Sequence, residues 1–135
     1  MRYDSAHDAI LIVEDEALLR EVETYMFEDA GYRVFTAETV DDAAHFLREH
    51  DKINVLFTDV NMPGSMSGTD LAQYVSQRWP QIGIVIVSGQ PLADNIPSGA
   101  SFHYKPFEAQ AVLRDVRKLV ARSRAQSRGG DAAAV

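Results

Sequence analysis

The sequence predicts an α/β fold built on one parallel sheet, and two observations support this prediction. Four short, mostly apolar runs each end on a polar residue: residues 10–13 precede Glu14, 53–58 precede Asp59, 82–87 precede Ser88, and 101–104 precede Lys105. Such runs are typical of strands that are buried on both faces of a sheet. Apolar residues recur at helical spacing between most of the runs, and alternation of strands with helices indicates parallel pairing.

The elements follow one another along the chain with recognisable ends. Strands are predicted over 9–13, 32–36, 53–58, 82–87 and 101–104, and helices over 16–30, 39–50, 69–79 and 107–123. Gly31 suits the end of the first helix, Thr39 is the predicted N-cap of the second, and Pro80 stops the third. The first helix has five apolar residues at the spacing of a core-facing stripe: Leu18, Leu19, Val22, Tyr25 and Met26.

Right-handed crossovers between these strands give a doubly wound, flavodoxin-like sheet of five strands in the order 2-1-3-4-5. A ligand site is expected at the switch point between the first and third strands, which end at Glu14-Asp15 and at Asp59. Residues 90–99 contain two prolines and a glycine, with too few apolar positions for a long amphipathic helix. The fourth helix of such a fold is therefore predicted to be short or degraded.

Length and composition restrict the class of protein. The 135 residues predict one domain over 9–122, preceded by an N-terminal extension over 1–8 and followed by a disordered tail over 123–135. The net charge of -7 disfavours direct binding to nucleic acid. The absence of cysteine excludes disulfides and thiolate chemistry. No apolar run approaches the roughly 20 residues of a membrane span, and the start lacks a signal peptide, so we expect a cytoplasmic protein without a membrane partner.

The polar residues at the strand ends suggest a cation site. Three carboxylates, from Glu14, Asp15 and Asp59, would repel one another unless a cation neutralised them, and an oxygen-rich site of this kind suits Mg²⁺. The alternative is that these acids are solvated, or that Asp15 caps the following helix. The Lys105 ammonium can pair with Asp59 or with a phosphoryl oxygen. The Ser88 hydroxyl can also donate to a phosphoryl oxygen from the same edge.

Together these strand ends resemble one known family. The motifs concerned are Val13-Glu14-Asp15-Glu16, Thr58-Asp59-Val60-Asn61-Met62-Pro63-Gly64, Gly68 with Asp70-Leu71, Val87-Ser88-Gly89 and Lys105-Pro106-Phe107. Over roughly residues 9–122 the chain resembles the receiver domain of bacterial two-component response regulators, in particular single-domain, chemotaxis-receiver-like members.

The resemblance implies a role for each site residue. Asp59 is the implied phosphoacceptor, and Mg²⁺ is implied to lie on Glu14, Asp15, Asp59 and the backbone carbonyl of Asn61. Three further residues complete the implied site: Ser88 as the switch hydroxyl, Lys105 as the bridge to the phosphoryl group, and Phe102, three residues before Lys105, as the switch aromatic. Such a protein catalyses only its own phosphorylation and dephosphorylation.

The resemblance also implies partners. A histidine kinase or histidine phosphotransfer protein would donate the phosphoryl group, and an unknown downstream protein would receive the signal from a monomer or weak dimer. We expect a stand-alone receiver, because little chain remains after Ser123 for an output module. Three alternatives stay open: a receiver fragment of a larger hybrid kinase, a non-phosphorylated receiver-like scaffold, and an Mg²⁺-dependent aspartyl phosphatase.

Overall fold

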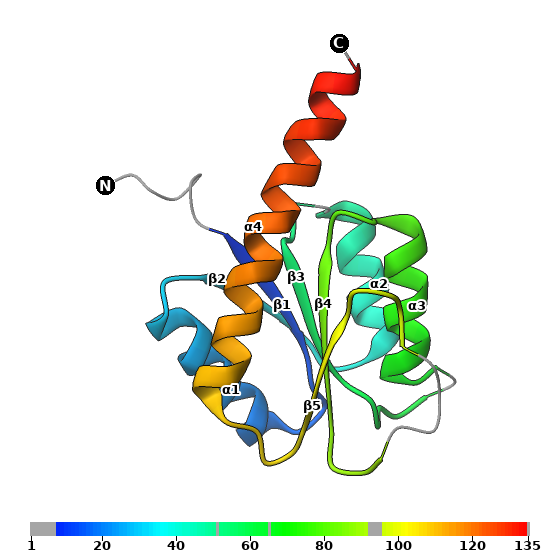
Figure 1. Cartoon of the computed structure of the whole chain (residues 1–135). Coiled ribbons are helices and arrows are strands. Elements are labelled where there is room, and N and C mark those ends of the chain that lie inside the picture. The colour runs from blue at the N-terminus through cyan, green and yellow to red at the C-terminus, as the bar shows by residue number, and fades with distance from the viewer. Residues whose placement is uncertain (1–7, 51, 65, 92–95, 135) are drawn as a thin grey trace.

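The computed structural model describes residues 8–50, 52–64, 66–91 and 96–134, with side chains described up to residue 127. Five parallel strands form one sheet in the order β2-β1-β3-β4-β5 (Figure 1). The strands are β1 (Ala9–Val13), β2 (Arg33–Ala37), β3 (Val55–Asp59), β4 (Gly83–Ser88) and β5 (Ser101–Tyr104). The helices are α1 (Ala17–Asp29), α2 (Val40–Glu49), α3 (Gly68–Arg78) and α4 (Ala109–Ala134). The predicted doubly wound, flavodoxin-like fold is confirmed.

Helices cover both faces of the sheet. Helices α1 and α4 pack on one face, and α2 and α3 pack on the other (Figure 1). Successive strand residues point to opposite faces. Leu11 and Leu56 therefore join the α2–α3 core, whereas Ile10 and Phe57 join the α1–α4 core. Because each strand is buried on both sides, its apolar run is continuous rather than alternating.

Side-chain caps fix where α2 and α3 begin. The Thr39 Oγ1 atom accepts a hydrogen bond from the Asp42 N–H at 3.0 Å, which confirms the predicted cap of α2. At α3, Ser67 and Asp70 form a capping box, each side chain accepting from the other's N–H at 3.1 Å. This box fixes the start of α3 close to the end of β3. Gly31 ends α1 with φ of +100°.

Helix α1 buries only part of the apolar stripe that its sequence indicated. Leu19 and Met26 are half-buried, and Met26 packs against the core. The side chains of Leu18, Val22 and Tyr25 are 70%, 59% and 70% exposed. Glu23 and Phe27 are buried instead. The Phe27 ring packs edge-on against a phenylalanine of β3, with ring centroids 5.1 Å apart. This large contact sets the rotation of α1 and leaves the Leu18–Val22–Tyr25 stripe, called the α1 stripe below, on the surface.

Helix α4 continues beyond the predicted end of the last helix. We expected a helix over 107–123 followed by a disordered tail, but α4 runs to Ala134 and projects past the sheet, at the end opposite to the carboxyl ends of the strands (Figure 1). Two hydrogen bonds from Arg124 to Asp8, at 2.8 and 2.6 Å, hold its middle. Alanine, arginine and glutamine favour helix, and this propensity outweighs the small and polar composition that predicted a disordered tail. In the described part of the chain, no helix combines the length and apolar character that a membrane crossing requires.

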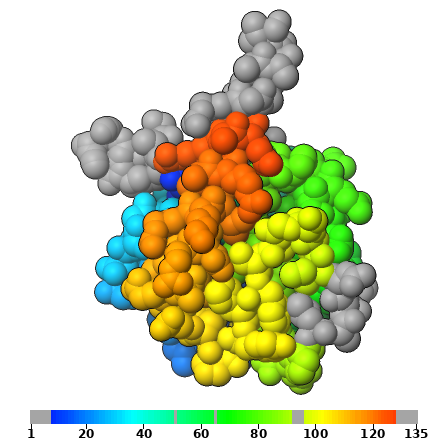
Figure 2. Space-filling model, in the orientation of Figure 1, coloured from blue at the N-terminus to red at the C-terminus, as the bar shows by residue number. Residues whose placement is uncertain are grey.

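The segment between β4 and β5 was predicted to hold at most a short helix. Residues 89–91 and 96–100 are not helical, and residues 92–95 lie outside the described part of the chain. In Figure 2 the yellow residues of β5, and those just before it, lie at the surface beside α4 in orange. In the described part of this segment no helix covers β5.

Candidate functional site

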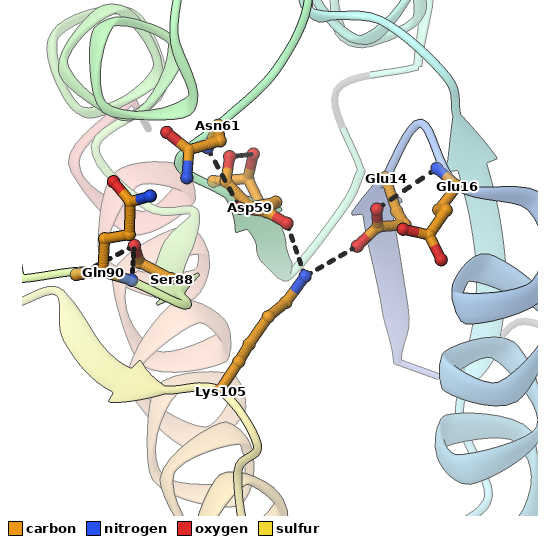
Figure 3. Close-up of polar contacts among 8 residues, drawn as sticks. Glu14, Glu16, Asp59, Asn61, Ser88, Gln90 and Lys105 are labelled. Atoms are coloured by element: carbon orange, nitrogen blue, oxygen red, sulfur yellow. Dashed lines mark hydrogen bonds and ion pairs between the residues drawn. The ribbon is translucent and has the colours of Figure 1, made fainter.

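The candidate site lies at the edge of the sheet where β1, β3 and β5 end. The Lys105 Nζ atom lies 3.3 Å from Glu14 Oε1 and 2.5 Å from Asp59 Oδ2, so that one ammonium joins two carboxylates (Figure 3). Both acids are buried, with 2% of Glu14 and 8% of Asp59 exposed. Their strands, β1 and β3, flank the switch point at which open α/β sheets bind ligands.

Backbone groups hold the second oxygen of each carboxylate. Glu14 Oε2 accepts a hydrogen bond from the Glu16 N–H at 3.2 Å, and Asp59 Oδ1 accepts one from the Asn61 N–H at 3.0 Å. Each acid is therefore oriented by the loop that follows its own strand, while Lys105 holds the two loops together. Charge-assisted contacts of this kind are stronger than neutral hydrogen bonds.

Burial and charge act on the ionisation of this group. Burial raises the pKa of Glu14, and the nearby Asp59 charge adds to that rise against the opposing effects of Glu16 and Lys105. Burial alone would lower the pKa of Lys105, but its hydrogen bond to Asp59 and the charges of Asp59 and Glu14 outweigh burial and raise it. The lysine is therefore a fixed cation at neutral pH. Because two carboxylates face a single ammonium, this part of the site favours the binding of a further cation.

Two predicted site residues lie apart from this cluster. Asp15 is exposed, and no hydrogen bond or ion pair reaches its side chain from the described residues. Ser88 is buried, but its hydroxyl donates to the Gln90 carbonyl at 2.8 Å and accepts from the Gln90 N–H at 3.1 Å (Figure 3). The Lys105 N–H donates to the Ser88 carbonyl at 2.7 Å. The structure thus places Ser88 next to the site with its hydroxyl engaged elsewhere.

The side chains of the candidate site can be tested for their fit to a metal ion. Within the described residues, no group of three acidic or histidine side chains is arranged to hold a metal ion. Glu14 and Asp59 nevertheless place two buried carboxylates on either side of the Lys105 ammonium. Mg²⁺ commonly takes one or two carboxylates and keeps several waters, so it does not need a closed cage of side chains. The residues present therefore fit Mg²⁺.

Strand β5 places the predicted switch aromatic between core and surface. Phe102 is half-buried, packs against the α2–α3 core and meets the Tyr104 ring edge-on, with centroids 4.8 Å apart. Tyr104 is exposed. His103 points to the other face of β5, where its Nε2 lies 2.7 Å from Asp115 Oδ2 of α4. Any movement of Phe102 therefore takes place next to an open surface.

Sequence reasoning gave no role to Glu23, which the structure buries in α1. Burial, and next the charge of Glu14, raises the pKa of Glu23 to about 8, and Lys105 opposes this rise. A helix pattern places a charged residue outward by default, so no signal in the sequence distinguished Glu23 from its exposed neighbours.

The comparisons with known proteins agree with this fold. The family model of the response regulator receiver domain matches residues 10–116, so the chain belongs to that family. A receiver domain of Clostridium thermocellum superposes with a TM-score of 0.80 at 25% identity, covering 88% of this chain and 98% of that one. TrrA of Thermotoga maritima, solved in complex with Mg²⁺-BeF, gives a TM-score of 0.75 at 24% identity, covering 83% and 98%.

Relatives of very different length share this domain. The chemotaxis protein CheY of Pseudomonas aeruginosa is 31% identical, and the match covers 84% of this chain and 96% of CheY. The transcriptional regulatory protein FixJ of Azorhizobium caulinodans is 32% identical over 90% of this chain, which spans only 59% of FixJ. The sensor kinase CckA of Brucella abortus is 28% identical over 86% of this chain, which spans 13% of CckA. The chain is thus a receiver domain of two-component signal transduction.

Proposed function

We propose that this receiver is a phosphorylation-controlled switch in which Asp59 accepts a phosphoryl group from a histidine kinase or a histidine phosphotransfer protein. The observation that carries the proposal is the Lys105 ammonium, which joins the Glu14 and Asp59 carboxylates at the switch point of the sheet. An Asp59 oxygen attacks the phosphorus of the phosphohistidine, a new O–P bond forms, and the P–N bond to the imidazole breaks. The imidazole leaves with the electron pair of that bond.

The residues around Asp59 position the group and stabilise its charge. Lys105 would turn from the carboxylate to the incoming phosphoryl oxygens, and the Asn61 N–H would keep Asp59 oriented. Glu14, Asp15, Asp59 and the backbone carbonyl of Asn61 are proposed to hold Mg²⁺, which would neutralise phosphoryl charge when bound. The Mg²⁺-BeF complex of TrrA supports a cation in this type of pocket.

Switching is proposed to depend on Ser88 and Phe102. For the Ser88 hydroxyl to donate to a phosphoryl oxygen, it must give up its hydrogen bond to the Gln90 carbonyl. Since Lys105 and Ser88 are also joined through their backbones, the ends of β4 and β5 would move together. Phe102 would then occupy or leave the half-buried space beside Tyr104, and another protein would bind the altered surface.

Asp59→Asn is expected to abolish phosphorylation. Purified protein incubated with Mg²⁺ and acetyl phosphate should gain the mass of one phosphoryl group, and the variant should gain none because an amide is not a competent nucleophile here. Intact-mass spectrometry measures both. Labelling of the variant to the same extent would place the phosphoacceptor elsewhere. No mass gain in the wild type, together with no response to beryllofluoride, would favour the non-phosphorylated scaffold.

The exposed α1 stripe is proposed as the docking surface for the phosphodonor protein. Leu18, Val22 and Tyr25 form an apolar surface on α1, which begins two residues after Asp15 at the rim of the site. A protein that brings a histidine to Asp59 must cover this rim. Surfaces of this kind, apolar and next to a reacting group, often bind partner proteins.

Val22→Asp is expected to slow phosphotransfer from a protein donor by about tenfold or more, since it places a charge in the centre of an apolar contact. Labelling by acetyl phosphate should be unchanged. The assay follows transfer from whichever autophosphorylated histidine kinase labels the wild type fastest. Gln77→Asp, at an exposed position of α3 on the opposite face of the sheet, is the matched control. Equal slowing by both variants would contradict a specific role for α1.

A further inference from the structure

Glu23 is a buried acidic side chain that the proposed phosphorylation mechanism does not use. It is 2% exposed, and its Oε1 atom is buried without a hydrogen-bond partner. No hydrogen bond or ion pair joins the Glu23 side chain to any other described residue. A carboxyl group without a partner in such surroundings strongly favours its neutral, protonated form.

Its position in α1 brings Glu23 towards the site. Residues four apart share one face of a helix, so Glu23 and Phe27 both face the sheet. Helix α1 starts at the edge where β1 ends and runs back along the sheet, which places Glu23 one turn nearer to that edge than Phe27 (Figure 1). Phe27 itself packs against β3 at Phe57. Glu23 therefore lies in the layer between this aromatic packing and the acidic pocket.

The charged groups that act on Glu23 are those of the pocket. Glu14 from β1 and Asp59 from β3 disfavour its ionised form, and Lys105 from the segment after β5 favours that form, although burial is the largest influence. The pKa of about 8 means that Glu23 keeps its proton at neutral pH in the absence of further positive charge. A change of charge in the pocket would therefore shift the protonation equilibrium of Glu23.

We propose that Glu23 is a proton-exchanging group coupled to the cation site: it holds its proton while no divalent cation lies beside Glu14 and Asp59, and releases it to solvent when a divalent cation binds there. The inference rests on the proposed function, which supplies that cation. A dication nearby stabilises the Glu23 carboxylate. By linkage, loss of the Glu23 proton strengthens cation binding by the same factor. Cation affinity, and hence readiness for phosphorylation, then rises with pH.

Isothermal titration calorimetry with MgCl₂ tests this coupling directly. Titrations at pH 7.5 in buffers of low and high ionisation enthalpy give the number of protons released for each Mg²⁺ bound. The wild type should release roughly half a proton more than Glu23→Gln, because binding of metal next to ionisable groups displaces protons. Glu21→Gln, which removes an exposed carboxyl from the other side of α1, should match the wild type.

The pH dependence of Mg²⁺ affinity gives a second readout. Between pH 6.5 and 8.5 the affinity of the wild type should rise several-fold more than that of Glu23→Gln or Glu23→Leu. A structural role alone would not change the number of protons released. If the wild type and both Glu23 variants bind Mg²⁺ with equal proton release, this inference is wrong and the proposed function stands. If the wild type binds no Mg²⁺ up to millimolar concentrations, the proposed metal site and this inference both fail.

Discussion

Gly68→Ala is expected to lower the free energy of unfolding by about 3 kcal/mol or more, because there is no room for a side chain at this position. A Cβ atom on Gly68 would overlap the backbone carbonyl oxygen of Asp59 and lie 3.0 Å from the Thr58 Oγ1 atom. Both neighbours belong to the buried end of β3. Relief of the overlap would require α3 or β3 itself to move.

Urea unfolding followed by the fluorescence of Trp79, the single buried tryptophan, measures this loss. Gly89→Ala is the matched control at the same edge of the sheet, because a Cβ atom there meets nothing within 4 Å. We expect the control to change stability by no more than about 0.5 kcal/mol. Equal stability of the two alanine variants would show that α3 does not approach β3 as closely as described.

The central cluster of the site could be predicted because it follows from topology. Glu14 and Lys105 lie 91 positions apart in the chain, yet both follow strands of one parallel sheet. The carboxyl ends of such strands lie at one edge of the sheet. The residues that follow them therefore come together at this edge, and this does not depend on how individual side chains pack. The prediction needed only the strand positions, which the apolar runs indicated, and the strand order that is typical of doubly wound sheets.

The buried face of α1 could not be predicted in the same way. Two sets of apolar residues recur at helical spacing in α1, and the choice between them depends on which large side chain fits the sheet. Because Phe27 packs against Phe57, the face of α1 that carries Phe27 is buried, and Glu23 on the same face is buried with it. A buried and unpaired carboxyl contradicts the amphipathic pattern, and such local conflicts are found mostly at functional positions.

Two other differences arise from local chemistry. The hydroxyl of Ser88 forms hydrogen bonds with the backbone of Gln90, and such local contacts compete with longer-range partners. The apolar pattern of a strand does not predict them. The continuation of α4 to Ala134 depends on helix propensity, and Arg124 pairs with Asp8 of the N-terminal segment. Neither the Ser88 contact nor the length of α4 can be predicted from composition alone.

Glu23→Leu is expected to remove a pH-dependent loss of stability. The folded-state pKa of Glu23 is about 8, against an ordinary value of 4.5, so the folded protein binds more protons than the unfolded chain between these values. The stabilisation linked to this proton is complete below about pH 4.5 and is lost as pH rises through 8. The full shift corresponds to on the order of 5 kcal/mol, and relaxation around the ionised group reduces the expected loss to about 2–3 kcal/mol.

Urea unfolding at pH 5 and pH 9, in the presence of a chelator, separates this effect from others. The raised pKa of Glu14 acts in the same direction, but it acts in the wild type and in Glu23→Leu alike. The difference between the two proteins therefore isolates Glu23, and it should favour Glu23→Leu by about 2–3 kcal/mol more at pH 9 than at pH 5. Glu21→Gln should follow the wild type at both pH values. Parallel stability curves for the wild type and Glu23→Leu would show that Glu23 is not held protonated by its surroundings, and the proposed coupling to the cation site would lose its basis.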